Sequence, residues 1–199
     1  MRIGRVLALF GLLLAAAPRP SAADAYMAPF IGVNFGGDGG RPLNDAARDK
    51  GRAAVGATFG TMGGGIFGIE VDVSYTKDFY PSVVAVPSGN NLITVMPALV
   101  LGVPIGGQQG LGIRPFALAG AGLVRRNFDF GSLTSVSQND LAFTVGGGVM
   151  AFFGAHVGIR GDVRHIRNFR VDDISLTGIN LERGTFNFSR ASGAIVFRF

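Results

Sequence analysis

Apolar and polar residues alternate along most of this chain, in short segments separated by clusters of Gly, Asn, Asp and Ser. The clearest example is 66–78, where apolar residues alternate with polar ones and Glu70 and Asp72 lie on the polar face. A period of two is the side-chain period of a β-strand. Eight such segments predict strands at 26–35, 52–61, 66–78, 91–103, 113–128, 140–153, 156–170 and 185–199.

The connections between these segments alternate in length. Long polar connections follow the first, third, fifth and seventh segments, whereas short turns, such as 62–65 and 154–155, follow the second, fourth and sixth. Transmembrane β-barrels have short periplasmic turns and longer extracellular loops. The chain is therefore predicted to be all-β: an eight-stranded antiparallel up-and-down transmembrane β-barrel with both ends on the periplasmic side.

The two faces of the predicted strands differ in chemistry. In three of them, the face expected to contact lipid consists of Phe67, Ile69, Val71, Val73, Tyr75, Phe143, Val145, Val149, Phe153, Val157, Ile159 and Val163. The opposite parity collects six charged residues, which we name the lumen charge cluster: Glu70, Asp72, Arg160, Asp162, Arg164 and Arg190. An Arg that faces lipid at mid-bilayer costs about 2–4 kcal/mol, so these charges are predicted to face the barrel interior.

The third and seventh strands of an eight-stranded barrel stand on opposite walls, and its interior is only just wide enough for side chains to fill it. We therefore expect Glu70 and Asp72 to reach Arg160 and Arg164 across the lumen. Two interpretations of the cluster stay open. A salt-bridged plug that holds the barrel closed is favoured over a charged constriction that selects small solutes, and both use the same residues.

The first 25 residues have the features of a cleaved signal peptide. Arg2 and Arg5 precede an apolar stretch over 6–17 that is too short to cross a bilayer as a helix. Small residues occupy the positions that a signal peptidase reads before Tyr26. We predict a signal peptide over 1–25 and a barrel domain over 26–199, with cleavage after Ala23 as the alternative.

Composition favours a membrane protein without membrane helices. Mean hydropathy is +0.38, yet the predicted barrel domain has no run of about 18 uncharged apolar residues, as a membrane helix needs. A closed barrel is the other way to span a bilayer. The net charge of +5 comes without a clustered basic and aromatic surface, so nucleic acid is not an expected partner. The chain has no Cys and no cofactor motif, so neither a metal nor a cofactor is expected.

The end of the chain places Ile195, Phe197 and Phe199 on one apolar face of a strand. This ending, the Gly-rich strand around 117–122 and the loop asymmetry resemble the small eight-stranded outer-membrane barrels: the OmpA transmembrane domain, OmpX, Ail and the Opa-like porin-family proteins. The resemblance implies a monomer in the outer membrane of a Gram-negative bacterium, in contact with membrane lipid and lipopolysaccharide. It also implies that Ile195, Phe197 and Phe199 form a C-terminal signal for the barrel assembly machinery.

The resemblance implies first a structural or small porin-like role, with small solutes as candidate cargo. The alternative is an adhesin that binds a host surface ligand through its extracellular loops. Partial alternation over 171–184 would suit a strand extension that offers an edge to such a partner.

A lipid A-modifying enzyme is the least expected function. Deacylases of this barrel size use a His, a nearby Ser and an acid. Here His165 is followed by Ile166 and Arg167, so the His-x-Ser pairing is missing, and His156 lies at a predicted turn. We therefore expect no enzymatic activity.

Overall fold

The computed structural model describes residues 24–36, 51–62, 66–77, 79, 89–106, 111–129, 135–169 and 186–199. The predicted signal peptide lies outside this part of the chain, except for Asp24 and Ala25, which begin the first strand. No helix in the described part is long and apolar enough to cross a membrane. The strands are β1 (Asp24–Phe35), β2 (Arg52–Met62), β3 (Phe67–Lys77), β4 (Gly89–Gly102), β5 (Ile105–Gly106), β6 (Gly112–Asp129), β7 (Ser135–Phe152), β8 (Val157–Asn168) and β9 (Asn187–Arg198).

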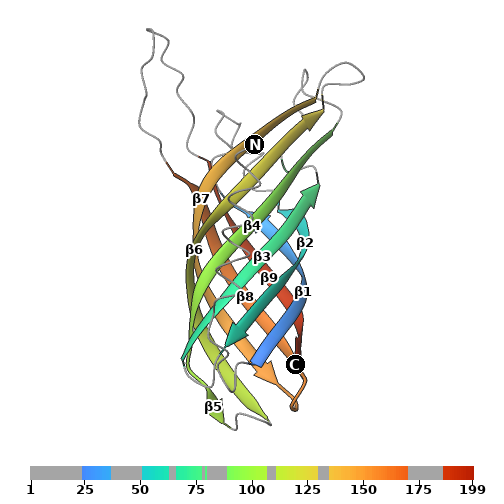
Figure 1. The fold of residues 1–199 in the computed structure, drawn as a ribbon. Helices are drawn as coiled ribbons and strands as arrows, with labels where there is room; N and C mark the ends of the chain where they lie inside the picture. The colour runs from blue at the N-terminus through green and yellow to red at the C-terminus, as the bar shows by residue number, and fades with distance from the viewer. Residues whose placement is uncertain are drawn as a thin grey trace.

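The strands form one antiparallel sheet that closes on itself. Their order is β4-β3-β2-β1-β9-β8-β7-β6-β5, and pairing between β4 and β6 completes the barrel. Because β5 has two residues and pairs only with the start of β6, the wall of the described part consists of eight long strands. The predicted eight-stranded antiparallel barrel is confirmed. The start of β1 and the end of β9 lie at the same end (Figure 1).

One boundary prediction was wrong by more than two residues. The strand expected from Asp140 begins at Ser135, and Ser135–Asn139 pair with Arg125–Asp129 of β6. The connection between β6 and β7 is therefore 130–134 rather than a long loop. Apolar and polar residues alternate along a strand only where lipid covers one of its faces. The hairpin continues beyond the apolar surface of the barrel, so its polar part shows no such alternation and was not predicted as strand.

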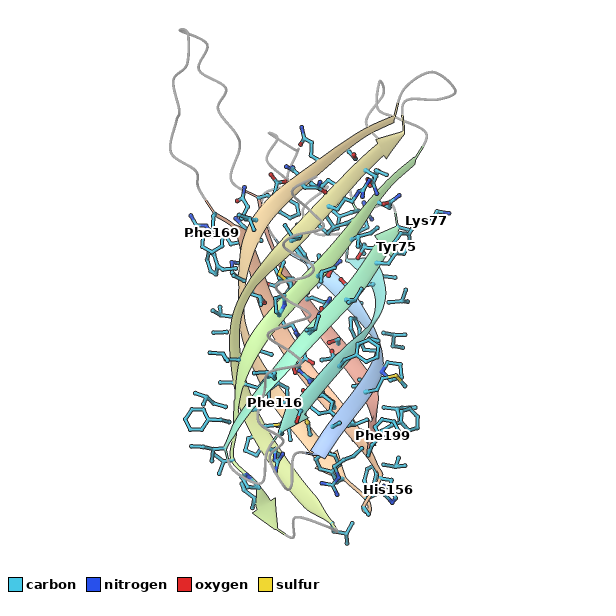
Figure 2. The ribbon with its side chains drawn as sticks, viewed as in Figure 1. Tyr75, Lys77, Phe116, His156, Phe169 and Phe199 are labelled. Carbon is cyan, nitrogen blue, oxygen red and sulfur yellow. The ribbon has the colours of Figure 1, made fainter. Side chains whose placement is uncertain are left out.

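The outward face of the barrel is apolar. Of the residues predicted to contact lipid, Val71 and Phe143 are half-buried and all the others are exposed. Side chains such as Tyr75 and Phe199 project away from the wall in Figure 2. Water would not favour so large an exposed apolar surface, whereas the hydrocarbon of a bilayer does.

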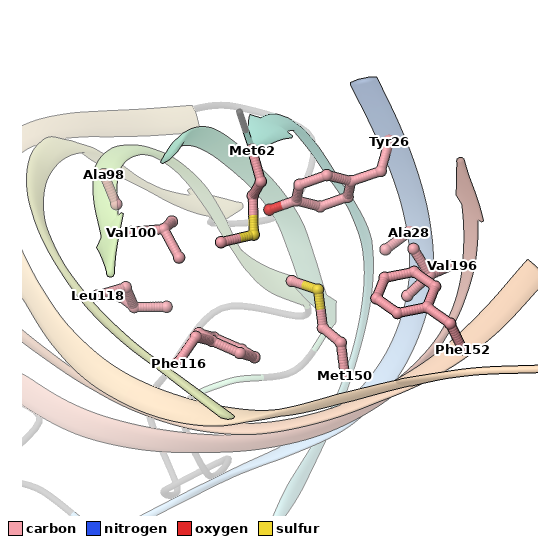
Figure 3. Packing of buried hydrophobic residues seen from close by; sticks show 10 residues of the cluster. All are labelled: Tyr26, Ala28, Met62, Ala98, Val100, Phe116, Leu118, Met150, Phe152 and Val196. Carbon is pink, nitrogen blue, oxygen red and sulfur yellow. The ribbon is translucent and has the colours of Figure 1, made fainter. Parts of the chain in front are cut away.

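The barrel interior is filled by two apolar clusters with a polar layer between them. The cluster near the start of β1 and the end of β9 (Figure 3) consists of Tyr26, Ala28, Met62, Ala98, Val100, Phe116, Leu118, Met150, Phe152 and Val196. The cluster at the opposite end consists of Leu92, Met96, Val124, Ala142, Ile166, Phe186 and Phe188, with Phe79 packed against it. We call them the lower and upper apolar clusters.

Candidate functional site

The lumen charge cluster lies between the two apolar clusters. Glu70 and Asp72 come from β3, and Arg160, Asp162 and Arg164 come from β8. These two strands are four pairings apart in either direction around the barrel, so they stand on opposite walls. Arg190 comes from β9, next to β8. Each of the six residues is less than a tenth exposed.

The Arg160 side chain extends across the lumen and binds Glu70 through both Nη atoms of its guanidinium. Its Nη1 donates to Glu70 Oε2 at 2.8 Å, and its Nη2 donates to Oε1 at 3.2 Å. Its Nε donates to Asp162 at 2.8 Å, two residues along the same strand. A bidentate guanidinium–carboxylate pair fixes both direction and distance, so it holds the two opposite walls in one geometry.

Arg164 and Arg190 complete the network. Arg164 Nε donates to Asp162 Oδ1 at 2.8 Å, so Asp162 bridges both arginines of β8. Arg164 also lies 2.9 Å from Glu70 and 3.5 Å from Asp72, as charge pairs without hydrogen-bond alignment. Arg190 Nη2 donates to Asp72 Oδ1 at 2.6 Å. The six residues thus join three carboxylates to three guanidinium groups, and their net charge is zero.

Four neighbours of this network were not predicted from the sequence. The Tyr26 hydroxyl donates to Glu70 at 2.6 Å, and the Thr58 hydroxyl donates to Asp72 at 3.1 Å. The guanidinium of Arg160 lies over the ring of Phe116, and that of Arg190 lies over the ring of Phe30, at 4.3 and 4.5 Å. Strand parity places all four inside, but only closure of the barrel shows which charge each one contacts.

The two histidines make local contacts. His165 Nδ1 lies 3.1 Å from Ser189 Oγ across the β8–β9 pairing, so the fold brings together a His and a Ser that the sequence separates. No hydrogen bond within the described residues joins His165 to a carboxylate. His156, in the turn before β8, lies with its Nδ1 3.2 Å from the backbone oxygen of Arg198. Among the described residues, no group of three His, Asp or Glu side chains is placed to hold a metal ion.

The end of the C-terminal strand is hydrogen-bonded to β1 and to the turn before β8. The Phe199 backbone N–H donates to Ala25 O at 2.9 Å, and Arg198 Nε donates to Ala155 O at 2.7 Å. Ile195, Phe197 and Phe199 are exposed on the outward face. Their role as an assembly signal stays a prediction.

A closed antiparallel barrel with an apolar exterior and a charged, buried interior defines a transmembrane β-barrel protein. The family model described as "Outer membrane protein beta-barrel domain" matches residues 6–191, so the chain belongs to this family and is a bacterial outer-membrane protein. A comparison with curated proteins finds no match.

Solved structures show the same fold. Neisserial surface protein A (NspA) is 14% identical, with a TM-score of 0.61 over 88% of this chain and 97% of NspA. Ail of Yersinia pestis, solved in complex with the heparin analogue sucrose octasulfate, is 13% identical, with a TM-score of 0.56 over 89% of this chain and 99% of Ail. At these identities the likeness concerns the fold alone.

Proposed function

We propose that this protein is a structural outer-membrane barrel whose lumen is sealed, and that it has no enzymatic activity. The observation that carries the proposal is the bidentate Arg160–Glu70 pair, which joins opposite walls at the level of a neutral, buried charge network. Apolar clusters lie above and below this network. A solute would have to break ion pairs and displace packed side chains at three levels, which does not suit a porin.

The same arrangement gives the barrel a rigid frame. Loops on a rigid scaffold are where binding by such proteins is usually found. The sealed barrel would therefore serve to hold its extracellular connections at the cell surface rather than to pass solutes.

Planar-bilayer conductance tests the sealed lumen. The wild-type barrel is expected to be silent. The variant Arg160→Ala/Arg164→Ala should give discrete, cation-selective steps, because three carboxylates would then face one remaining guanidinium and water would enter the layer. Arg167→Ala is the matched control, since Arg167 is an exposed cation on the same strand. Wild-type steps equal to those of the double variant would contradict the proposal and favour a porin.

A second candidate function is recognition of a partner at the extracellular end. Pairing of β7 with β8 begins at Ala142, whereas β7 pairs with β6 from Ser135. Residues 135–140 therefore have β6 on one side and no paired strand on the other within the described chain. A strand edge of this kind can accept an extended segment of an adhesin's ligand.

Shortening the β6–β7 hairpin tests this candidate. Deletion of 127–129 together with 135–137 removes matched residues and keeps the register of the pairs below them. We expect cells that display this variant to lose adhesion to the host cell surface while the amount of folded barrel stays the same. Equal adhesion by wild-type and shortened barrels would contradict the adhesin function.

A further inference from the structure

The first strand of the barrel begins earlier than cleavage after Ala25 would allow. β1 starts at Asp24, and the pairs Asp24–Met62 and Ala25–Thr61 form the periplasmic end of its ladder with β2. Both pairs continue the register of the rest of the ladder without a break. Cleavage after Ala25 would remove the two pairs, whereas cleavage after Ala23 would keep them.

Ala25 also takes part in the pairing of β1 with β9, which joins the first and last strands. The backbone N–H of Phe199 donates to the backbone oxygen of Ala25 at 2.9 Å. A chain that began at Tyr26 would lack this oxygen, and the Phe199 N–H would lose its acceptor in the barrel. The carbonyl group of Ala25 therefore fixes the position of Phe199 at the periplasmic end of the wall.

Tyr26 needs a fixed backbone because its side chain belongs to the buried polar layer. Its hydroxyl donates to Glu70 at 2.6 Å and accepts from Arg160 Nη1 at 3.3 Å. The first residues of a chain are poorly ordered unless other contacts hold them. With Asp24 and Ala25 before it, Tyr26 lies inside a paired strand instead of at its end. A start at Asp24 therefore stabilises the contact of Tyr26 with the lumen charge cluster.

The position of the new α-ammonium group favours the same start. At Tyr26 this charge would lie one residue from Met27, whose partner Phe197 is exposed on the lipid-facing side of the wall. A residue of a strand advances the chain by about 3.4 Å, so a start at Asp24 moves the charge about 7 Å further from this pair. Because a charge in hydrocarbon is costly, the position further from the lipid-facing residues is the more stable one.

The sequence around the two candidate bonds does not decide between them. A signal peptidase reads small residues at the last and third-last positions before the bond that it hydrolyses. Cleavage after Ala23 would use Ala23 and Ser21, and cleavage after Ala25 would use Ala25 and Ala23. Both pairs are small, so the difference between the two products lies in the barrel that each one can form.

We propose that a signal peptidase hydrolyses the Ala23–Asp24 peptide bond, and that Asp24 and Ala25 complete β1 of the mature barrel. One water molecule is consumed in this step. The C–N bond breaks, Ala23 keeps a carboxylate and leaves with the leader, and Asp24 gains the α-ammonium group. The proposal concerns the start of β1, so it does not depend on whether the lumen conducts.

Intact-mass spectrometry and N-terminal sequencing of the barrel, isolated from the outer membrane of cells that express the full chain, test the processing site. We expect Asp24 as the first residue. Ala25→Leu blocks only the alternative bond and changes a side chain that is exposed on the wall, so it should give the same start and a normal amount of barrel. Ala23→Leu should leave most of the chain unprocessed. A wild-type chain that begins at Tyr26, or loss of processing in Ala25→Leu, would overturn the proposal.

Refolded barrels that differ only in their first residue test the role of the two added residues. Each is released from an N-terminal tag so that it begins at Asp24 or at Tyr26, and each is unfolded with urea in phospholipid vesicles. We expect a lower urea midpoint for the barrel that begins at Tyr26. The matched control begins at Asp24 and carries Ala25→Leu, which keeps the backbone oxygen that binds Phe199, so its midpoint should not fall. Equal midpoints for the Asp24 and Tyr26 starts would contradict the proposal that residues 24 and 25 complete β1.

Discussion

Replacement of Glu70 by leucine is expected to lower the free energy of unfolding by about 3–5 kcal/mol. Glu70 accepts two hydrogen bonds from Arg160 and one from Tyr26, and it lies 2.9 Å from Arg164. Leucine has a similar volume but accepts none of these bonds. Arg160 would keep only Asp162 as a charged partner, and the Tyr26 hydroxyl would lose the acceptor that it has in this buried layer.

Urea unfolding of the barrel in phospholipid vesicles, followed by circular dichroism and by gel mobility, measures this loss. Asp140→Asn is the matched control. This change removes the carboxylate of the ion pair between Asp140 and Arg126. Both side chains of that pair are partly exposed, Asp140 by 17% and Arg126 by 16%, so the expected cost is about 0–1 kcal/mol. Equal stabilities of Glu70→Leu and Asp140→Asn would show that the charge network does not hold the walls together.

Replacement of Gly148 by alanine is the second change with a large expected effect, about 1–3 kcal/mol of destabilisation. Gly148 is on β7, opposite Asp162 of β8, and has the parity of the inward-facing residues. A Cβ at this position would clash with the backbone oxygen of Gly161 and would lie 2.7 Å from the Cα of Asp162. Backbone atoms of a paired strand cannot move aside without disturbing the sheet.

The added methyl group would also disturb the lumen charge cluster. Asp162 is the residue that binds both Arg160 and Arg164, so a shift of its backbone moves an acceptor shared by two buried arginines. Gly148→Val should therefore cost more than Gly148→Ala, and assembly of folded barrel in the outer membrane should fall with it.

Gly161→Ala provides the control on the paired strand. Gly161 faces outward, and an added Cβ would meet nothing within 4 Å. We expect no loss of stability, or a gain of about 0.4–1 kcal/mol from the less flexible unfolded chain. The same urea titration applies. A loss in Gly161→Ala as large as that in Gly148→Ala would mean that glycine is needed for strand flexibility rather than for space beside Asp162.

The predictions for Glu70 and Gly148 both concern how the barrel interior is packed around the lumen charge cluster. Gly148 of β7 pairs with Asp162 of β8, and the absence of a Cβ lets the two strands approach closely beside the lumen charge cluster. Gly146 shows the same relation, since a Cβ there would lie 2.9 Å from the Cα of Arg164 on β8. Gly146 and Gly148 on β7 and their charged partners Arg164 and Asp162 on β8 are thus parts of the same packing arrangement.

The amino-acid sequence by itself determined the strands, their number and the chemistry of their two faces. The reason is that a strand in a membrane barrel has lipid on one side only, so a period of two carries both the secondary structure and the direction of each side chain. Closure with eight strands then places β3 opposite β8, which is why Glu70 and Asp72 could be expected to face Arg160 and Arg164.

The tertiary structure decided which groups meet. Residues 26, 58, 70 and 160 are far apart in the chain, and their contacts depend on the stagger of strands around the closed barrel, which local pattern does not specify. Pairing alone also extends β7 back to Ser135 and brings His165 beside Ser189. Alternation tells which side of the wall a residue occupies, whereas register and closure determine its neighbours.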